Sequence, residues 1–183
     1  MAKYKVGYFV GSLSSTSINR ELSEALIRLA PEDLEFTEIP IGNLPLYSQD
    51  HDANYPPEAT ALKDAIHQSD AVLFVTPEYN RSIPGVLKNA IDHASRPYGQ
   101  NAWAGKPAGV IGVSIGAIGT AIAQQHLRNV LAYLDMPTLG QPEAFIQAKE
   151  GLFDAANEIG PNSRQFLQDW MDRYVAWVNM HSR

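Results

Sequence analysis

A serine-rich loop near the N-terminus has the composition of an anion-binding site. The loop Gly11–Asn19 (GSLSSTSIN) contains four serines and one threonine within six residues, and a segment of helical periodicity follows it. Hydroxyl groups and free amides at a helix N-terminus favour phosphate, because the helix dipole attracts negative charge. The loop lacks the lysine of GxxxxGK[ST] and the glycines of GxGxxG, so a phosphate monoester suits it better than a nucleoside triphosphate or a dinucleotide. Ser17 or Thr16 alone could instead be an ordinary helix cap.

Two further segments carry groups suited to a flat heterocycle. Thr76–Gly85 has prolines near both ends that stiffen it, and it offers free amides, the Asn80 carboxamide and the aromatic face of Tyr79. Ser114–Gly119 contains two glycines, which let a backbone approach a ligand closely or adopt a positive φ. Taken alone, the first segment could equally be an ordinary strand–helix turn, and the second a site of tight helix–sheet packing.

The order of elements predicts that these three segments meet. Apolar runs rich in β-branched or aromatic residues alternate with segments of helical periodicity, which indicates a right-handed parallel sheet with helices on both faces. The expected strands are Val6–Val10, Leu34–Ile39, Ala71–Val75, Ala108–Ser114 and a short fifth strand, Ala144–Gln147. The expected helices are Asn19–Leu29, Glu58–Gln68, Pro84–Ala94, Thr120–Leu134 and Ser163–Met180. Because ligands of such sheets bind beyond the carboxyl ends of the strands, the three loops should converge on one site.

Composition narrows the function classes. The 183 residues carry a formal net charge of −6, which argues against a general nucleic-acid-binding surface. Cysteine is absent, so disulfides, thiolate catalysis and iron–sulfur clusters are excluded, and the five histidines show no metal-ligand spacing. The N-terminal run has no signal-peptide pattern, and no apolar stretch approaches the roughly 20 residues that span a bilayer. We therefore expect a cytoplasmic protein without membrane insertion that forms a single domain over residues 1–183.

Four stretches of the sequence together resemble the NADPH-dependent FMN reductases, and more narrowly the bacterial NAD(P)H:quinone and chromate reductase branch of that family. The stretches are GSLSSTSIN, LPLYSQD, TPEYNRSIPGVLKNAIDHASRP and GKPAGVIGVSIGAIGTAIAQQHLR, and the resemblance spans roughly residues 3–147. It implies a flavodoxin-like three-layer α/β/α sandwich with a five-stranded parallel sheet in the order 2-1-3-4-5. It also implies non-covalently bound FMN, NADPH or NADH as the electron donor, and association as a homodimer or homotetramer.

The resemblance also implies particular contacts with FMN. The expected phosphate-binding residues are Ser12, Ser14, Ser17, Ile18 and Asn19. The residues expected beside the isoalloxazine ring are Pro77, Glu78, Tyr79 and Asn80, and those expected near the ribityl chain and ring edge are Ser114 and Gly116. Many relatives carry arginine where this chain has Ser14, so hydroxyls and amides rather than a fixed positive charge should hold the phosphate.

On this interpretation the flavin carries the chemistry. Hydride would pass from NAD(P)H to the flavin, and a small acceptor such as a quinone, chromate, an azo dye or free flavin would then be reduced by a ping-pong route. No side chain need act as nucleophile or general acid. Glu78 could bias the flavin redox potential by its charge, or its backbone alone contacts the ring while its side chain points to solvent or a neighbouring subunit. Arg81 and Arg96 could pair with reduced flavin or with NADPH phosphates, or be ordinary solvated arginines.

Two other functions stay open, a flavodoxin-like electron carrier and a non-enzymatic FMN-binding protein. Such carriers are typically more acidic, and the glycine and threonine that usually follow their phosphate loop are absent here. A phosphatase-like enzyme fits poorly, because no aspartate nucleophile, cysteine or metal cluster accompanies the serine loop.

The last two expected helices carry more apolar surface than one sheet face needs. Trp103, Trp170, Tyr174 and Trp177 add to this surplus, so we expect part of it to be buried in a homodimer. The longest irregular stretch, Gly42–Pro57, is either a functional loop or a solvated surface excursion.

Overall fold

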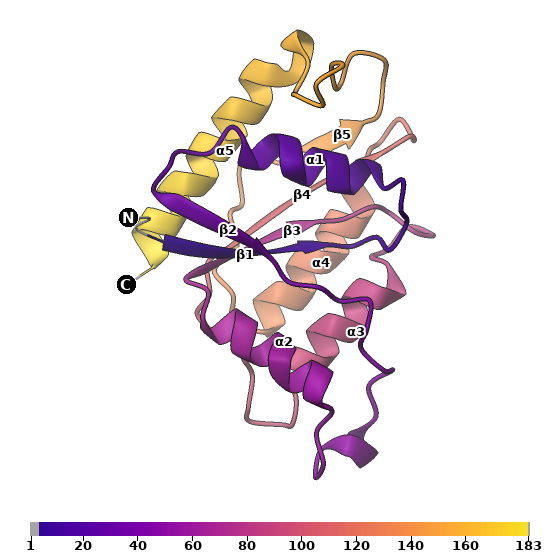
Figure 1. Ribbon diagram of the computed structural model, residues 1–183, viewed down its shortest axis with the longest axis vertical. Helices are drawn as coiled ribbons and strands as arrows, with labels where there is room; N and C mark the ends of the chain where they lie inside the picture. The colour runs from indigo at the N-terminus through magenta and orange to yellow at the C-terminus, as the bar shows by residue number, and fades with distance from the viewer. Residues whose placement is uncertain (1–3, 183) are drawn as a thin grey trace.

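Five parallel strands form one sheet between two layers of helices in the computed structural model, which describes residues 4–182 (Figure 1). The strands are β1 (Tyr4–Val10), β2 (Leu34–Glu38), β3 (Ala71–Val75), β4 (Ala108–Ser114) and β5 (Phe145–Gln147). The helices are α1 (Ile18–Ile27), α2 (Pro57–His67), α3 (Gly85–Ala94), α4 (Ala121–Tyr133) and α5 (Pro161–His181), with a short 3₁₀ helix, η1, at Gln49–His51. The sheet order is β2-β1-β3-β4-β5 and every neighbouring pair is parallel. The expected flavodoxin-like fold is therefore confirmed, including its short fifth strand.

Each face of the sheet has its own buried core. Helices α1 and α5 cover one face, and α2, α3 and α4 cover the other (Figure 1). Every residue of β3 is buried, because helices lie on both sides of this central strand. Successive side chains of a strand point to opposite faces, so the central strands supply Val6, Leu73, Val75 and Ile111 to one core and Phe9, Val72, Phe74 and Val110 to the other.

Local signals account for the helix ends. Helix α1 follows Ser17, whose side chain accepts a hydrogen bond from Arg20 N as an N-cap. Helix α5 has Pro161 in its first turn, where the missing N–H costs nothing. Helix α3 begins at Gly85 rather than at the expected Pro84, because Pro84 has an extended ψ of 144°.

Three of the four aromatic residues expected at a subunit interface lie inside the protein. Trp103, Trp170 and Tyr174 each have 0% exposure. The rings of Trp170 and Tyr174 stack with centroids 5.7 Å apart. Tyr174 also lies against Gly109 of β4, where an added Cβ would come within 2.7 Å of its ring. The expectation of surplus interface surface is therefore wrong for these three residues, and Trp177 is partly buried.

The irregular segment 42–57 is anchored to helix α3. Asn89 accepts a hydrogen bond from Tyr47 N at 2.9 Å and donates one to Pro45 O at 2.9 Å. The buried His93 of the same helix has its Nε2 atom 2.8 Å from the same Pro45 oxygen. Side chains of α3 therefore hold the backbone of this segment in place.

Membrane-spanning helices and metal-ligand clusters are both absent from the described range. Within residues 4–182, no helix combines the length and the apolar composition that a bilayer crossing requires. Over the same part of the chain, no three His, Asp or Glu side chains come together as a metal site would need.

Candidate functional site

The three segments meet around one open cavity of about 250 Å³ beyond the carboxyl ends of β1, β3 and β4. The loops that follow these strands leave the sheet at the same edge (Figure 1). The cavity is lined by Ser12, Ser14, Thr16, Ser17, Ile18, Asn19, Pro77, Glu78, Tyr79, Val113, Ser114 and Ile115. Of the residues expected to bind FMN, all but Asn80 and Gly116 belong to this set. Thr16, Val113 and Ile115 line the cavity beyond that expectation.

The serine-rich loop is folded by its own side chains. Ser12 Oγ accepts a hydrogen bond from Ser14 N at 3.3 Å, and Ser14 Oγ accepts one from Thr16 N at 3.2 Å. A hydroxyl that accepts a bond from an amide keeps its own hydrogen for another acceptor. The loop therefore offers hydroxyl donors at the N-terminus of α1, where the helix dipole also favours an anion.

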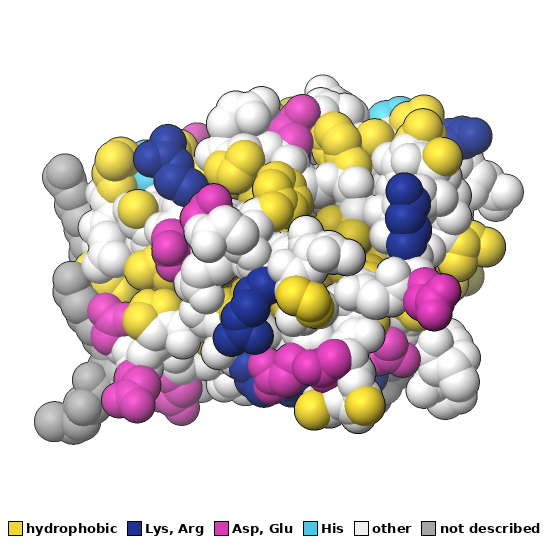
Figure 2. Space-filling model, turned by 90° about the horizontal axis from the view of Figure 1, so that it is seen from above, with side chains coloured by type: hydrophobic (Ala, Val, Ile, Leu, Met, Phe, Trp, Pro, Cys, Tyr) yellow, Lys and Arg dark blue, Asp and Glu magenta, His cyan; other side chains and the backbone are white. Residues whose placement is uncertain are grey.

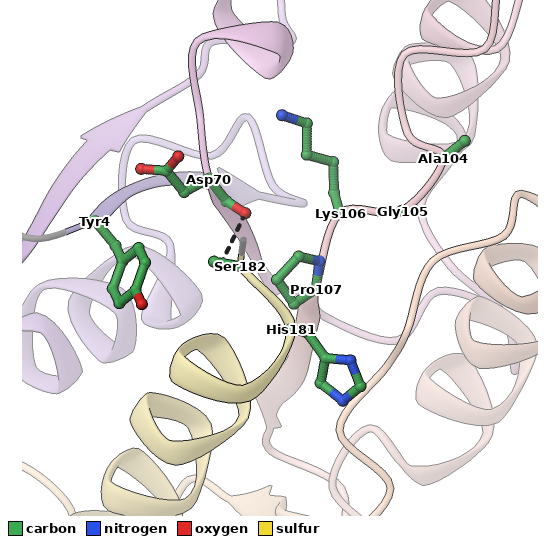
Figure 3. A pocket seen from close by; sticks show the side chains of 8 residues that line it. All are labelled: Tyr4, Asp70, Ala104, Gly105, Lys106, Pro107, His181 and Ser182. Atoms are coloured by element: carbon green, nitrogen blue, oxygen red, sulfur yellow. Dashed lines mark hydrogen bonds between the residues drawn. The ribbon is translucent and has the colours of Figure 1, made fainter.

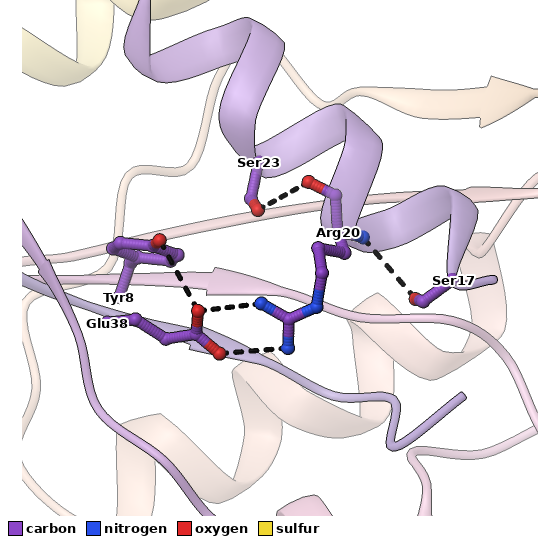
Figure 4. Close-up of polar contacts among 5 residues, drawn as sticks. All are labelled: Tyr8, Ser17, Arg20, Ser23 and Glu38. Carbon is purple, nitrogen blue, oxygen red and sulfur yellow. Dashed lines mark hydrogen bonds and ion pairs between the residues drawn. The ribbon is translucent and has the colours of Figure 1, made fainter. Parts of the chain in front are cut away.

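The first turn of α1 is capped and braced (Figure 4). Ser17 Oγ accepts from Arg20 N at 3.3 Å, so the helix-cap interpretation holds for this serine, which also lines the cavity. The Arg20 guanidinium donates to both Glu38 carboxylate oxygens, at 2.6 and 2.9 Å, and Tyr8 Oη lies 3.5 Å from the same carboxylate. The hydrogen bond with Glu38 raises the pKa of Arg20, and burial, then the Glu38 charge, raises the pKa of Tyr8. No sequence pattern pairs Arg20 with Glu38, because only the folded chain brings them together. The ion pair neutralises the positive charge in the first turn of α1.

Asn19 lines the cavity, but its side chain is bonded to strand β4. Its Nδ2 donates to Val113 O at 2.9 Å, and its Oδ1 accepts from Val113 N at 3.0 Å. The residue is 2% exposed. Both heteroatoms of the carboxamide are therefore engaged by one residue of the sheet.

The segment after β3 contains a tight turn. Tyr79 N donates to Ser82 O at 2.9 Å, and Ser82 N donates to Tyr79 O at 3.0 Å. The two central residues, Asn80 and Arg81, have φ values of 52° and 63°. Two successive positive φ values are the pattern of a type I′ turn, in which arginine is unfavourable. The turn holds Tyr79 half-exposed beside the cavity and leaves Asn80 outside the lining set.

The side chain of Glu78 is buried, which corrects the expectation that it points to solvent or to a neighbouring subunit. Its Oε2 accepts from the amides of Ile122 and Ala123 in the first turn of α4, at 2.9 and 3.0 Å. Its Oε1 accepts from Arg81 at 3.1 Å, and the Glu78 side chain is 7% exposed. A carboxylate at this position satisfies free amides and interacts favourably with the helix dipole. Glu78 therefore ties the ring-side loop, residues 76–85, to helix α4.

The two arginines considered for flavin or NADPH contacts lie apart from each other. Arg81 is paired with Glu78, and its own side chain is 67% exposed. Arg96 lines a different cavity of about 350 Å³ together with Tyr47, Gln49, Asp52 and Tyr98. Within one chain, Arg96 therefore does not contribute to the cavity at the strand ends.

Glycines shape the loop after β4. Ser114 Oγ accepts from Gly116 N at 2.9 Å, and Gly119 has a positive φ of 60°. Gly112 was not singled out by sequence reasoning, yet an added Cβ there would lie 2.0 Å from Thr76 O. Glycine at 112 therefore lets β4 pass close to the start of the ring-side loop.

Exposed apolar side chains occur on the three segments that form the cavity and in the first turn of α4. Leu13, Tyr79, Ile115, Ile118 and Ile122 are all exposed. On the side of α1 and α5, acidic and basic side chains are interspersed over the surface (Figure 2). This face therefore shows charges of both signs rather than a field of one sign.

Another cavity of about 280 Å³ lies by the start of β1 and the end of α5 (Figure 3). Three of its polar residues are joined to the protein backbone by hydrogen bonds. Ser182 Oγ donates to Asp70 O at 3.2 Å, Asp70 Oδ2 accepts from Lys5 N at 2.7 Å, and Lys106 Nζ donates to Ser69 O. None of the residues expected to bind FMN lines this cavity.

The chain is similar to several characterised proteins. It matches the family described as NADPH-dependent FMN reductase over residues 4–151. It is 54% identical over 175 residues to a 2-hydroxy-1,4-benzoquinone reductase of a Burkholderia species, covering 95% of this chain and 96% of the relative. It is 49% identical over 179 residues to a quinone reductase of Pseudomonas putida, covering 97% and 96%. The solved structure of FerB, a flavoenzyme NAD(P)H:(acceptor) oxidoreductase from Paracoccus denitrificans, superposes with a TM-score of 0.94 at 46% identity, covering 98% of this chain and 100% of FerB.

Proposed function

The chain belongs to the NADPH-dependent FMN reductase family, and from this premise we propose that it oxidises NAD(P)H through bound FMN and reduces quinones or other small acceptors. The observation that carries the proposal is the meeting of the serine-rich loop, the ring-side loop and the loop after β4 around one cavity. The relatives named for quinone reduction are 54% and 49% identical over almost the whole chain, which supports quinones as the acceptor class.

The residues around the cavity fit the two ends of FMN. The hydroxyls of Ser12, Ser14 and Ser17 and the free amides of α1 suit the phosphate, which needs donors and a favourable dipole. Pro77 and Tyr79 offer apolar and aromatic surface to the isoalloxazine ring. When bound, FMN supplies the redox chemistry, accepting hydride from NAD(P)H and reducing the acceptor. The part of the chain is to hold both ends of the cofactor in a cavity that is open to solvent.

An absorption experiment tests the proposal. Purified protein incubated with FMN and freed of excess should show flavin absorption, which NADPH or NADH should bleach under anaerobic conditions. Addition of 1,4-benzoquinone should then restore the absorption. A protein that takes up no FMN would contradict the central claim.

The same experiment separates the alternative functions. A flavodoxin-like carrier would retain FMN, but NAD(P)H would bleach it only when a separate reductase is added. A non-enzymatic FMN-binding protein, once reduced by dithionite, would pass no electrons to quinone, dye or chromate.

Self-association is part of the proposal, as a homodimer or homotetramer. Exposed apolar side chains on the loops after β1 and β4 and in the first turn of α4 support it, since exposed apolar surface commonly marks interfaces. These are Leu13, Ile115, Ile118 and Ile122. Light scattering at micromolar concentration should give a mass of at least twice the 20.1 kDa of one chain. A monomer under these conditions would contradict it.

A further inference from the structure

Asn19 links the two halves of the cavity, and we propose that it is a positioning residue that holds the phosphate-binding helix in register with the strand leading to the flavin ring. The inference rests on the proposed function, because it concerns how this chain presents two half-sites to FMN: the serine-rich loop for the phosphate and the loops after β3 and β4 for the ring. The link is the pair of hydrogen bonds between the Asn19 carboxamide and the backbone of Val113, at 2.9 and 3.0 Å.

The link occupies a gap in the sheet. Strand β4 pairs with β3 as far as Ile111, whose carbonyl accepts from Thr76 N at 3.0 Å. Alternate residues of a parallel strand direct their N–H and C=O groups to the same neighbour, so those of Val113 face the place where β3 would continue. Strand β3 ends at Val75, and its ladder with β4 stops at the bond from Thr76 N. The Asn19 carboxamide supplies both the donor and the acceptor that the missing strand would have supplied.

The two ends of the link belong to different half-sites. Asn19 is the second residue of α1 and the last residue of the serine-rich loop, whereas Val113 directly precedes Ser114 at the end of β4. The residues are 94 positions apart in the sequence. Because the carboxamide is buried and both its heteroatoms are bonded, it is held in one orientation. The side chain therefore acts through the backbones that it joins rather than as a ligand of the phosphate.

Three single variants separate this role from its alternatives. Asn19→Ala removes the link. Ser14→Ala removes one hydroxyl from the phosphate end only. Asn101→Ala is a matched structural control, since Asn101 donates to Leu134 O at 2.9 Å and accepts from Trp103 N at 3.0 Å, before the start of β4. The readouts are the Kd for FMN and, at saturating FMN, the visible circular dichroism and midpoint potential of the bound flavin.

A positioning role predicts a distinct pattern. Asn19→Ala should raise the Kd for FMN about tenfold, the factor expected when the two hydrogen bonds to Val113 are lost. It should also change the visible circular dichroism and the midpoint potential of the bound flavin. Ser14→Ala should raise the Kd but leave both ring signals unchanged, and Asn101→Ala should lower Tm alone. Ring signals of Asn19→Ala that match the wild type would overturn the inference while the proposed function stands. A wild-type chain that binds no FMN would overturn the proposed function and the inference with it.

Asn19→Asp keeps the test decisive if the alanine variant fails to fold. In this variant the ionised carboxylate can accept from Val113 N but repels Val113 O, whereas the protonated carboxyl donates to that oxygen as asparagine does. Burial raises the pKa of such a carboxyl, so acid should restore the link at about pH 5. The ratio of variant to wild-type Kd should therefore fall between pH 8 and pH 5, and a ratio independent of pH would overturn the inference.

Discussion

The Glu78 carboxylate accepts two hydrogen bonds from amides in the first turn of α4 and one from Arg81. Its charge is therefore compensated by the protein itself. The structure therefore indicates that Glu78 holds the ring-side loop, a role that the sequence did not suggest, rather than presenting a free charge to a flavin. The strained positive φ values of Asn80 and Arg81 occur in the same loop, next to the residue that anchors it.

Loss of this anchor should reduce stability. Glu78→Ala leaves the amides of Ile122 and Ala123 without their acceptor, and the free energy of unfolding should fall by about 2 kcal/mol. Glu78→Gln should lose less, because its carbonyl oxygen can still accept from both amides. Urea unfolding of the three proteins checks this order, and equal stability of Glu78→Ala and wild type would contradict the capping role.

Single residues also mark the limit of sequence reasoning. The types and spacing of residues in the three loops predict a polar site, and most of those residues line one cavity. The partners of their side chains could not be predicted. Glu78 bonds to Ala123, 45 residues away, and Asn19 bonds to Val113, 94 residues away. No local pattern encodes such contacts, since only the folded chain brings the groups together.

The positions of the strands could be predicted from the sequence, whereas the packing of the aromatic rings against them could not. Runs such as Ala71–Val75 are apolar on both faces, which is typical of a central parallel strand. The rings of Trp170 and Tyr174 are buried although they were expected at a subunit interface. That expectation assumes that the sheet under the helix carries side chains of ordinary size. Gly109 leaves space on β4 into which these rings fit. Burial of the two rings therefore depends on a glycine of a different element, strand β4.

Helix α3 should protect the segment 42–57 from proteolysis. Asn89→Ala removes the bonds to Tyr47 N and Pro45 O, so the exposed Leu46 between them should be cleaved faster by chymotrypsin. Mass spectrometry of timed digests measures this rate. Asn101→Ala serves as the control for general destabilisation, and equal rates in the two variants would argue against a local anchor.

At the scale of the whole molecule, topology gives the location of the site. In a parallel sheet of this order, the loops after β1, β3 and β4 reach the same edge, so their convergence followed from the alternation of strands and helices. The alternation gives no information on the depth of the cavity or on Arg96, which lines another cavity of the same chain. Those properties depend on the packing of loops whose lengths and bends the periodicity does not encode.

Stability should fall at alkaline pH. Burial raises the pKa of Tyr55 to about 12 from its ordinary value of 10.0, and burial also raises the pKa of Tyr8, Tyr47 and Tyr174. A raised folded-state pKa contributes stability that is complete below pH 10 and is lost as the pH rises towards 12. Burial lowers the pKa of Lys63 and Lys106, which opposes this trend only up to their ordinary value of 10.5. The decline should therefore be clearest above that pH.

Tyr55→Phe provides the control. The variant loses the hydrogen bond that the Tyr55 hydroxyl donates to His93 O, so at pH 7 it should be less stable than wild type by about 1 kcal/mol. That difference should shrink between pH 10 and pH 12, because only the wild type carries this ionisable hydroxyl. Urea unfolding at several pH values measures it, and a constant difference would exclude Tyr55 as a contributor to the alkaline loss.

The brace between Arg20 and Glu38 has a consequence for the ionic strength at which the protein works. Exposed charges are screened by salt over a Debye length of about 8 Å at 0.15 M, whereas hydroxyl and amide donors in contact with an anion are affected far less. Since Glu38 neutralises the cation in the first turn of α1, affinity for FMN should vary little between low and high salt. Glu38→Gln would release a positive charge beside the serine-rich loop. That variant should bind FMN more tightly than the wild type in dilute buffer, and the difference in Kd should disappear as salt is added. The Arg20–Glu38 pair should therefore make the affinity for FMN lower but less dependent on ionic strength.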